Sequence, residues 1–303
     1  MKNKNNDSSL DITSIITLSI VAATWAGSFI FIKIGLREIP PVTLALLRFA
    51  LAFSAIGIMT LLTGANKGAK MNLKRDFIPL SILALTGVTL IYIFQFYSMK
   101  YTSASVGSII MNTSVIFMAF FSAIVFKEKI GARKIVGIFL AFFGLFITLS
   151  KCSLDILRFD AQELFGDALM IASAICWAIY STYGKKMLQS YSPMVSTTIV
   201  FGLGAFYLVP FAIFESPLSV IPKITWLGWA SILYLSLFCS VFGYVLWNRG
   251  LTRMETVKVG MFLYLIPMVT MMLSYLFLGE EITYATIAGG ALVIVGVYLT
   301  ETS

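Results

Sequence analysis

Two stretches of the sequence decide the fold: KEKIGARKIVGIFLAFFGLFITLS at residues 127–150 and GEEITYATIAGGALVIVGVYLTET at residues 279–302. Each leads from a short charged segment into an apolar run of about 20 residues, the length that crosses about 30 Å of hydrocarbon as a helix. The two stretches match at a fixed spacing of 152 residues, which pairs Glu128 with Glu280, Ile130 with Ile282, Gly137 with Gly289 and Gly144 with Gly296. The same charged start and glycine spacing therefore occur twice in the chain.

The offset of 152 residues extends over a whole half of the sequence. Without a gap it also aligns Trp25 with Trp177, Lys33 with Lys185, Pro41 with Pro193, Phe49 with Phe201 and Tyr92 with Tyr244. Two apolar stretches share some residues by chance, but chance does not readily align Trp, Pro, Glu and Gly at one offset. The sequence therefore predicts an internal duplication, with one repeat at residues 1–150 and the other at residues 151–303.

The composition indicates that lipid surrounds most of the chain. Of the 303 residues, 59% are hydrophobic and 12% are charged, and the mean hydropathy is +0.92. A soluble protein of this size could not hide so much apolar surface. The apolar runs predict an all-α integral membrane fold with ten membrane-spanning helices. We expect five spans in the first repeat, at residues 12–31, 40–62, 77–99, 102–126 and 131–150, and five in the second, at 165–184, 193–214, 226–247, 256–278 and 282–300.

The distribution of Lys and Arg predicts the orientation. If the N-terminus is cytoplasmic, 15 of these residues lie on the cytoplasmic side of the expected spans and 6 lie outside. This excess favours an inner-membrane protein with both termini in the cytoplasm. Because each repeat has an odd number of spans, the second repeat must cross the membrane upside down. Such inverted repeats can open a shared midplane cavity to either side in turn, so the pattern favours a secondary transporter of small organic solutes.

Other classes of function fit the sequence less well. Histidine is absent, and Cys152, Cys176 and Cys239 show no paired spacing, so we expect no metal site and no cofactor. The net charge of +8 is explained by Lys and Arg at span ends, and we expect no nucleic-acid partner. A membrane-embedded enzyme would need a catalytic histidine, a metal cluster or paired midplane carboxylates. A scaffold would not explain polar residues deep in the spans.

Several motifs are similar to those of a known family. They are WAGSFIFIKIG at 25–35, PPVTLALLRF at 40–49, YTSASVGS at 101–108, KEKI at 127–130, GIFLAFFG at 137–144, LGEEI at 278–282 and GGALVIVG at 289–296. Together they cover almost the whole chain, which resembles the EamA-like family of ten-span exporters in the drug/metabolite transporter superfamily. Members of that family move amino acids, other metabolites or drugs, so the resemblance implies transport but not a particular cargo. We expect export of amino acids or related small metabolites; export of drugs, or import of small organic solutes, is the alternative. Pro267 stands where the family has a proline in the ninth span, whereas Val115 stands at the matching place in the fourth.

Arg48 is the most informative single residue. It lies eight residues into the second expected span, about 12 Å deep at 1.5 Å per residue. A charge at that depth costs about 2.5–3.5 kcal/mol on insertion scales, so it should face the protein interior and have a partner. It could bind a substrate carboxylate or form part of a gate, or it could bond backbone carbonyls in a purely structural role. Its counterpart at the offset of 152 is Val200, which does not decide between these roles.

Further candidates for substrate binding lie on polar and aromatic helix faces. Helical spacing of i, i+3 and i+4 groups Tyr92, Gln95 and Phe96 in the third span, and Tyr244, Trp247 and Asn248 in the eighth. These side chains could line a cavity, or form an aromatic belt at the membrane interface, above all Trp247. Asn112 and its counterpart Tyr264 lie mid-span and could line a cavity or join two helices. Trp177 and Tyr180, with Trp25, could line the cavity or simply pack.

Carboxylates and small residues have simpler interpretations. Glu128, Glu280 and Glu281 precede the last span of each repeat, and Asp167 lies near the start of the sixth span, where each would stabilise the N-terminus of its own helix. None lies mid-span, which argues against a buried proton carrier. Small residues let helices approach closely, either within the bundle or between the protomers of a homodimer. The residues with this spacing are Gly137, Ala141, Gly144, Gly289 and Gly296.

Overall fold

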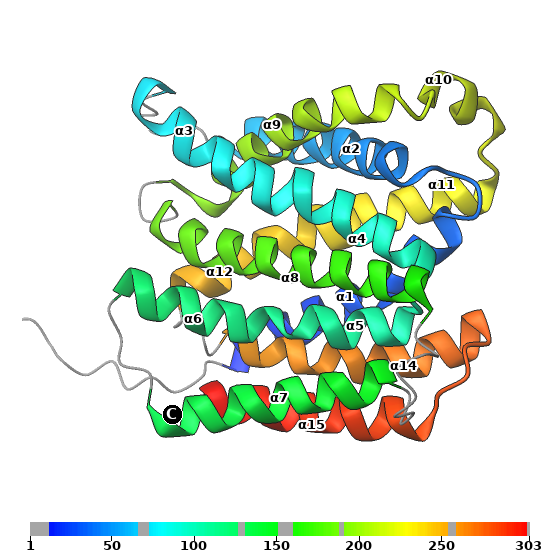
Figure 1. The fold of residues 1–303 in the computed structure, drawn as a ribbon. Coiled ribbons are helices and arrows are strands. Elements are labelled where there is room, and N and C mark those ends of the chain that lie inside the picture. Colours follow the sequence, from blue (N-terminus) through cyan, green and yellow to red (C-terminus); the bar gives the residue numbers. More distant parts are fainter. Residues whose placement is uncertain are drawn as a thin grey trace, which may run out of the picture.

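The computed structural model of the chain describes residues 12–65, 73–126, 131–150, 160–187, 191–253 and 259–301. Within these ranges every regular element is a helix, as the apolar runs predicted (Figure 1). Glu128 and most of the polar segment between the expected repeats lie outside them.

The helices follow one another along the chain in the order of the expected spans. In the first half they are α1 (Ile12–Gly35), α2 (Pro41–Leu62), α3 (Leu73–Ala84), η1 (Leu85–Thr89), α4 (Leu90–Tyr101), α5 (Ala104–Asn112), α6 (Ser114–Phe126) and α7 (Ala132–Ser150). In the second half they are α8 (Ala161–Met187), α9 (Pro193–Ile213), α10 (Pro217–Val220), η3 (Ile221–Lys223), α11 (Trp226–Leu233), η4 (Tyr234–Phe242), α12 (Gly243–Arg253), η5 (Met261–Tyr264), α14 (Leu265–Leu278) and α15 (Tyr284–Glu301). The short helices α10 and η3 lie in a segment that the sequence analysis treated as a loop.

Seven helical stretches of the described chain are long and apolar enough to cross a membrane: Thr13–Gly35, Pro41–Leu62, Arg75–Tyr101, Ala104–Val125, Ala161–Lys185, Pro193–Ile213 and Trp226–Arg253. Three shorter apolar helices cover Ile135–Thr148, Phe262–Leu278 and Tyr284–Gly296. Each stretch falls on one of the expected spans. Large apolar side chains also face outward, among them Phe139, Phe143, Phe206, Leu276 and Phe277. The protein is therefore an all-helical, multi-pass membrane protein.

Irregular turns occur at corresponding places in the two halves. The π-helical segment η1 interrupts the third expected span, and the π-helical segment η4 interrupts the eighth. The residues that lie 152 positions after those of η1 all fall within η4. The fourth span breaks at Thr113, between α5 and α6, and the ninth changes from the 3-10 turn η5 to α14 at Leu265, the counterpart of Thr113. Val115 thus does not prevent a break in the fourth span. The break forms through Thr113, whose amide and hydroxyl both donate to the Ile110 carbonyl, at 3.0 and 2.6 Å.

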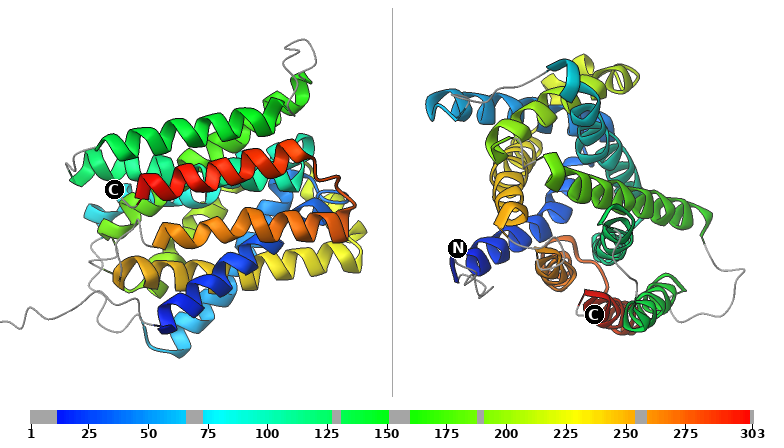
Figure 2. Two further views of the ribbon diagram at one scale, coloured as in Figure 1. Left: turned by 90° about the horizontal axis from the view of Figure 1, so that it is seen from below. Right: turned by 90° about the vertical axis from the view of Figure 1, so that its left-hand side faces the viewer.

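The small residues hold α7 and α15 together within one molecule. A Cβ atom at Gly144 would lie 2.6 Å from the Gly289 carbonyl oxygen and 2.7 Å from the Val293 nitrogen, and one at Gly296 would meet the backbone of Gly137 and Ala141. The two helices form a pair at one edge of the bundle (Figure 2). Because this stripe is buried between α7 and α15, it does not supply a contact between protomers.

Two of the carboxylates act on other helices than the sequence predicted. Glu280 does not cap its own helix, α15, which begins only at Tyr284; its carboxylate instead accepts from the amides of Ala104 and Ser105 at the start of α5, at 2.7 and 3.1 Å. Asp167 lies in the second turn of α8 and accepts from the Thr102 hydroxyl at 2.7 Å. These partners lie far apart in the sequence and meet only in the folded chain. Sequence position alone therefore could not identify them.

Two further carboxylates act in the same way at this end of the bundle, which we call the capped end. Glu215 accepts from the amides of Val42 and Thr43 at the start of α2, at 3.1 and 2.7 Å. Glu38 accepts from the amide and hydroxyl of Thr225, at 2.9 and 2.7 Å, and these bonds lower the pKa of Glu38. Glu38, Glu215 and Glu280 therefore each join one half of the chain to a helix start in the other half.

Candidate functional site

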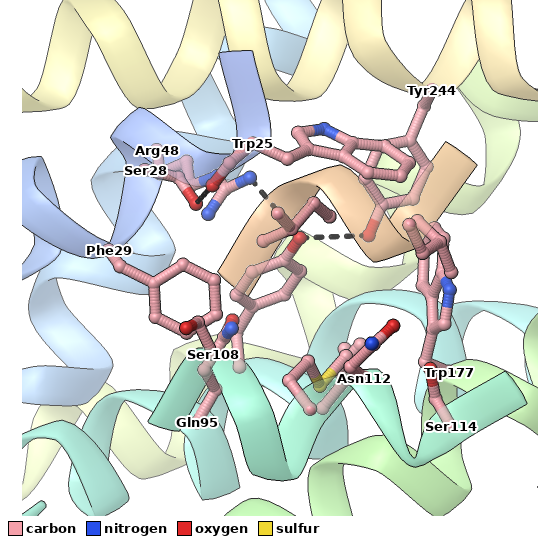
Figure 3. A pocket seen from close by; sticks show the side chains of 15 residues that line it. Trp25, Ser28, Phe29, Arg48, Gln95, Ser108, Asn112, Ser114, Trp177 and Tyr244 are labelled. Carbon is pink, nitrogen blue, oxygen red and sulfur yellow. Dashed lines mark hydrogen bonds between the residues drawn. The ribbon is translucent and has the colours of Figure 1, made fainter. Parts of the chain in front are cut away.

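A cavity lies among the central helices. It contains about 560 Å³ of empty space, including the part that is open to solvent. It is lined from both halves of the chain, by Trp25, Ser28, Phe29, Arg48, Ile91, Tyr92, Gln95, Ser108, Met111, Asn112 and Ser114 from the first and by Trp177, Tyr244, Leu263 and Ile266 from the second. Figure 3 shows these side chains around the cavity. Six predicted site residues, Arg48, Tyr92, Gln95, Asn112, Trp177 and Tyr244, thus meet at one place.

Eight of the 15 described lining residues form four pairs that the offset of 152 relates. Every residue that the second half contributes has its counterpart in the lining: Trp25 with Trp177, Tyr92 with Tyr244, Met111 with Leu263 and Ser114 with Ile266. The aromatic pairs also touch, with ring centroids 5.2 Å apart for Trp25 and Trp177. Equivalent helices of the two halves therefore face each other across the cavity.

Arg48 lies on α2 and is 2% exposed. Its Nε donates to the Ser240 hydroxyl at 2.8 Å and its Nη2 to the Tyr92 hydroxyl at 3.2 Å. The guanidinium carbon also lies 4.2 Å from the centroid of the Tyr92 ring, within the range of a cation–π contact. Within the described residues no carboxylate pairs with it, and no backbone carbonyl accepts from it. The arginine is held by hydroxyls and rings, and no carboxylate of the described chain compensates its charge.

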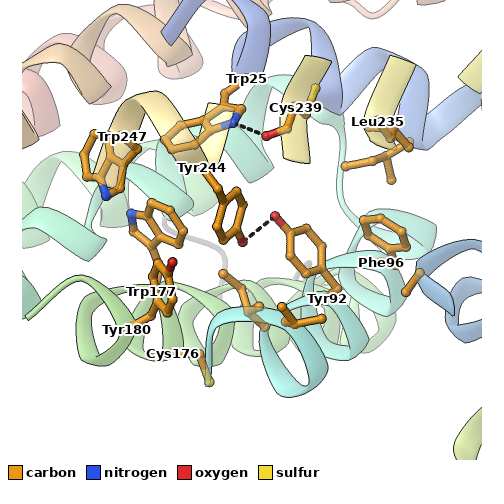
Figure 4. Packing of buried hydrophobic residues seen from close by; sticks show 14 of the residues in the cluster. Trp25, Tyr92, Phe96, Cys176, Trp177, Tyr180, Leu235, Cys239, Tyr244 and Trp247 are labelled. Atoms are coloured by element: carbon orange, nitrogen blue, oxygen red, sulfur yellow. Dashed lines mark hydrogen bonds between the residues drawn. The ribbon is translucent and has the colours of Figure 1, made fainter. Parts of the chain in front are cut away.

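Two aromatic side chains bond carbonyls inside the π-helical segments. The Tyr92 and Tyr244 hydroxyls lie 3.0 Å apart, and Tyr244 donates to the Gly87 carbonyl in η1 at 2.7 Å. The Trp25 indole donates to the Cys239 carbonyl in η4 at 2.9 Å (Figure 4). Gly87 and Cys239 are counterparts at the offset of 152. The irregular turns thus fix the orientation of rings that line the cavity.

Two amides in the cavity wall are free to bind a ligand. Asn112, at the break between α5 and α6, is 3% exposed, and neither its Oδ1 nor its Nδ2 has a hydrogen-bond partner among the residues that the structure describes. No hydrogen bond reaches Gln95 within the described part of the chain either. The hydroxyl of Ser114 is also buried and has no hydrogen-bond partner among the described residues. Because burying an unpaired polar group costs about 1–3 kcal/mol, these groups indicate a site that a ligand or water completes.

Burial decides between the interpretations that the sequence left open for the aromatic residues. Tyr92, Gln95, Tyr244 and Trp247 are all at least 94% buried, so they do not form an aromatic belt at the membrane interface. Trp247 packs on Trp25 and Trp177, with ring centroids 5.3 and 5.5 Å apart, but does not line the cavity.

Three predicted site residues do not line this cavity. Tyr180 stacks on Trp177 at 5.4 Å between centroids, and its ring lies against the backbone of Gly87, where a Cβ atom would collide with it. Asn248 donates to the hydroxyls of Tyr180 and Thr197, at 3.1 and 3.0 Å. Tyr264 is buried beside the cavity-lining Leu263. Tyr180 and Asn248 therefore support the aromatic wall from behind.

The sequence analysis missed several lining residues, notably Ser28, Ser108, Ser114, Met111 and Leu263. Two signals could have found some of them. Ser108 precedes Asn112 by one helical turn, so it shares the face of that residue. Met111 and Leu263 are counterparts at the offset of 152, as are the predicted Trp25 and Trp177. Ser28 gave no signal, because a serine in an apolar span has no feature that distinguishes it from packing.

Comparisons with known proteins agree with this architecture. The model of the EamA-like transporter family matches residues 12–150 and again residues 164–302. The chain belongs to the EamA-like transporter family. It is a membrane transporter and not an enzyme.

Individual relatives span nearly the whole chain. An uncharacterized transporter of Archaeoglobus fulgidus is 40% identical over 93% of this chain and 95% of its own. Probable amino-acid metabolite efflux pumps of Salmonella typhimurium and Escherichia coli are 29% and 26% identical, each over 92% of both chains. A solved structure that is 16% identical, with a TM-score of 0.67 over 95% of this chain and 96% of its own, shares the fold.

Proposed function

We propose that this EamA-like transporter exports amino acids or related small metabolites across the inner membrane by alternating access. In this proposal ten spans form two inverted repeats, at residues 1–150 and 151–303, and both termini are cytoplasmic. The observation that carries the proposal is the central cavity, whose lining pairs counterpart residues of the two halves. A cavity at the interface of inverted repeats can be opened to one side and then to the other when the repeats rock.

The kind of cargo is supported by the cavity and by the relatives. The cavity is lined by apolar and aromatic side chains with a few polar groups, which is the composition typical of small-molecule sites. Two of the relatives are probable amino-acid metabolite efflux pumps. No carboxylate lies among the described residues that line the cavity. This favours a gradient of the solute or of an exchanged solute over a proton carried within the cavity, and a proton route elsewhere in the protein is the alternative.

Counterflow in liposomes tests this function. The purified chain is reconstituted, the liposomes are loaded with one unlabelled solute from a panel of amino acids, their derivatives, sugars and drugs, and uptake of the labelled solute is followed. We expect transient accumulation for amino acids or their derivatives. Ser108→Trp, which fills the cavity, should abolish it, whereas Ser54→Trp on the exposed face of α2 should not. Exchange of drugs or sugars alone would refute the proposed cargo.

Labelling of engineered cysteines tests the topology. Cysteines at Ala65 and Ser192 follow the second and the sixth expected span, so inverted repeats with a cytoplasmic N-terminus place both inside the cell. A membrane-impermeant maleimide should leave both unlabelled in intact cells and label both after permeabilisation. Labelling of only one of them in intact cells would show that the second repeat is not inverted as proposed.

A further inference from the structure

The charge balance of the cavity restricts what it can hold. Among the 15 described residues that line it, Arg48 is the only ionisable group other than tyrosine, and none is Asp, Glu or Lys. Two carboxylates of the capped end, Glu215 and Glu280, are already engaged by the amides of α2 and α5. An empty cavity therefore carries one positive charge, which burial makes costly unless a bound group compensates it.

The guanidinium of Arg48 is able to receive such a group. Two hydrogen bonds, to Ser240 and Tyr92, use two of its five N–H donors. Within the described chain no other hydrogen bond reaches it, and it lines the cavity. A guanidinium with free donors binds a carboxylate with charge-assisted and often bidentate hydrogen bonds. Its contact with the Tyr92 ring holds the plane of the donors in place.

The polar groups that would bind the rest of the ligand lie on α4 and α5. The amides of Gln95 and Asn112 have no partner within the described residues and enter the cavity from a different side than Arg48 does (Figure 3). Amides accept and donate, so they suit a neutral hydroxyl, carbonyl or acylated nitrogen of the ligand. A free ammonium group would instead find no carboxylate in the wall, and would add a second positive charge to the site.

We propose that the cavity binds organic monocarboxylates derived from amino acids, with the carboxylate on Arg48 and a neutral polar group on Asn112 and Gln95, in preference to the zwitterionic amino acid. A monoanion neutralises the cavity, whereas a zwitterion leaves its net positive charge in place and a cation doubles it. This selectivity rests on the proposed transport function and narrows its substrate class.

A series of three solutes with one side chain tests the preference. Leucine is a zwitterion, 2-hydroxy-4-methylpentanoate is the corresponding monoanion, and leucinol is the cation. Binding is followed by the change in intrinsic tryptophan fluorescence, to which the cavity-lining Trp25 and Trp177 contribute, and transport by counterflow in liposomes with protein-free liposomes as the blank. We expect the hydroxy acid to bind at least about tenfold more tightly than leucine, and leucinol to bind most weakly.

Two substitutions test the assignment of the residues. Asn112→Asp is nearly isosteric and adds one negative charge to the cavity, so leucine should then bind better than the hydroxy acid. Arg48→Gln should remove the preference for the anion. Its matched control is Arg249→Gln, which removes the charge of an exposed arginine on α12 and should leave the preference unchanged. The reversal in Asn112→Asp remains informative even if Arg48→Gln does not fold.

The outcomes separate this inference from the proposed function. Equal or tighter binding of leucine by the unaltered protein, or an unchanged order in Asn112→Asp, would overturn the preference for monoanions while leaving transport intact. Tight binding of the hydroxy acid without any counterflow would support the preference and overturn the transport proposal instead.

Discussion

Removal of the Glu280 carboxylate should shift the protein toward a state that is open at the capped end. Glu280 follows α14 in the second half of the chain, and it accepts from the amides of Ala104 and Ser105, and from the Ser105 hydroxyl at 3.0 Å, in the first half. If the halves separate at this end during transport, these three bonds must break. Under the alternating-access proposal, Glu280 therefore stabilises only the state that is closed at this end.

The magnitude follows from the bonds that are lost. Substitution of a good helix cap costs about 0.5–2 kcal/mol, and the carboxylate charge at the N-terminus of α5 adds to it. For Glu280→Ala we expect the free energy that favours the closed over the open state to fall by about 2 kcal/mol. This corresponds to a rise of about thirtyfold in the ratio of open to closed molecules. Glu281→Ala is the matched control, because Glu281 is exposed and makes no hydrogen bond within the described residues.

Accessibility of a cysteine at Ser108 measures this ratio. Ser108 lines the cavity and is 1% exposed. In the proposed orientation the capped end faces outward, so an impermeant maleimide added outside intact cells should reach Ser108→Cys only when that end opens. In a background without Cys152, Cys176 and Cys239, Glu280→Ala should raise the labelling rate about thirtyfold and Glu281→Ala should not change it. A rate that is the same in both variants would show that the Glu280 cap does not hold the halves together.

Two further predictions concern stability in detergent. Gly144→Ala should lower the free energy of unfolding by about 1–3 kcal/mol, since its Cβ would lie 2.6 Å from a backbone oxygen of α15. The control, Gly57→Ala, has open space around it and should be neutral or stabilising. Equal shifts of the melting temperature in the two variants would argue against close packing of α7 on α15. Tyr244→Phe should cost about 1–3 kcal/mol because it leaves the buried Gly87 carbonyl without its donor, and a melting temperature equal to that of the unaltered chain would contradict that role.

Sequence reasoning identified the apolar helices and several residues that meet at the cavity, because both depend on local patterns. Apolar runs of sufficient length gave the helices, and helical spacing placed Tyr92 and Gln95 on one face. Arg48 was predicted to face the protein interior because exposing a charge to lipid at its depth is costly. The same reasoning could not find the partners of Glu280 and Asp167, since these contacts join residues 65 or more positions apart. It also placed Tyr180 and Asn248 in the cavity, although helical spacing cannot distinguish a lining residue from one directly behind it.

The polar residues of the cavity depart from the pairing that Trp25 and Tyr92 keep. Trp25 and Tyr92 have identical counterparts in Trp177 and Tyr244, whereas Arg48 has Val200 and Asn112 has Tyr264. This difference has a physical reason under the proposed mechanism. The rings make the walls on which the two halves rock, and similar walls favour similar inward-open and outward-open states. A small organic solute has no twofold symmetry, so a site with the same charge on both sides could not hold its anionic end and its apolar end at once. Selectivity therefore requires the two halves to differ where they contact the charged part of the cargo, and Arg48 is the residue at which they differ most.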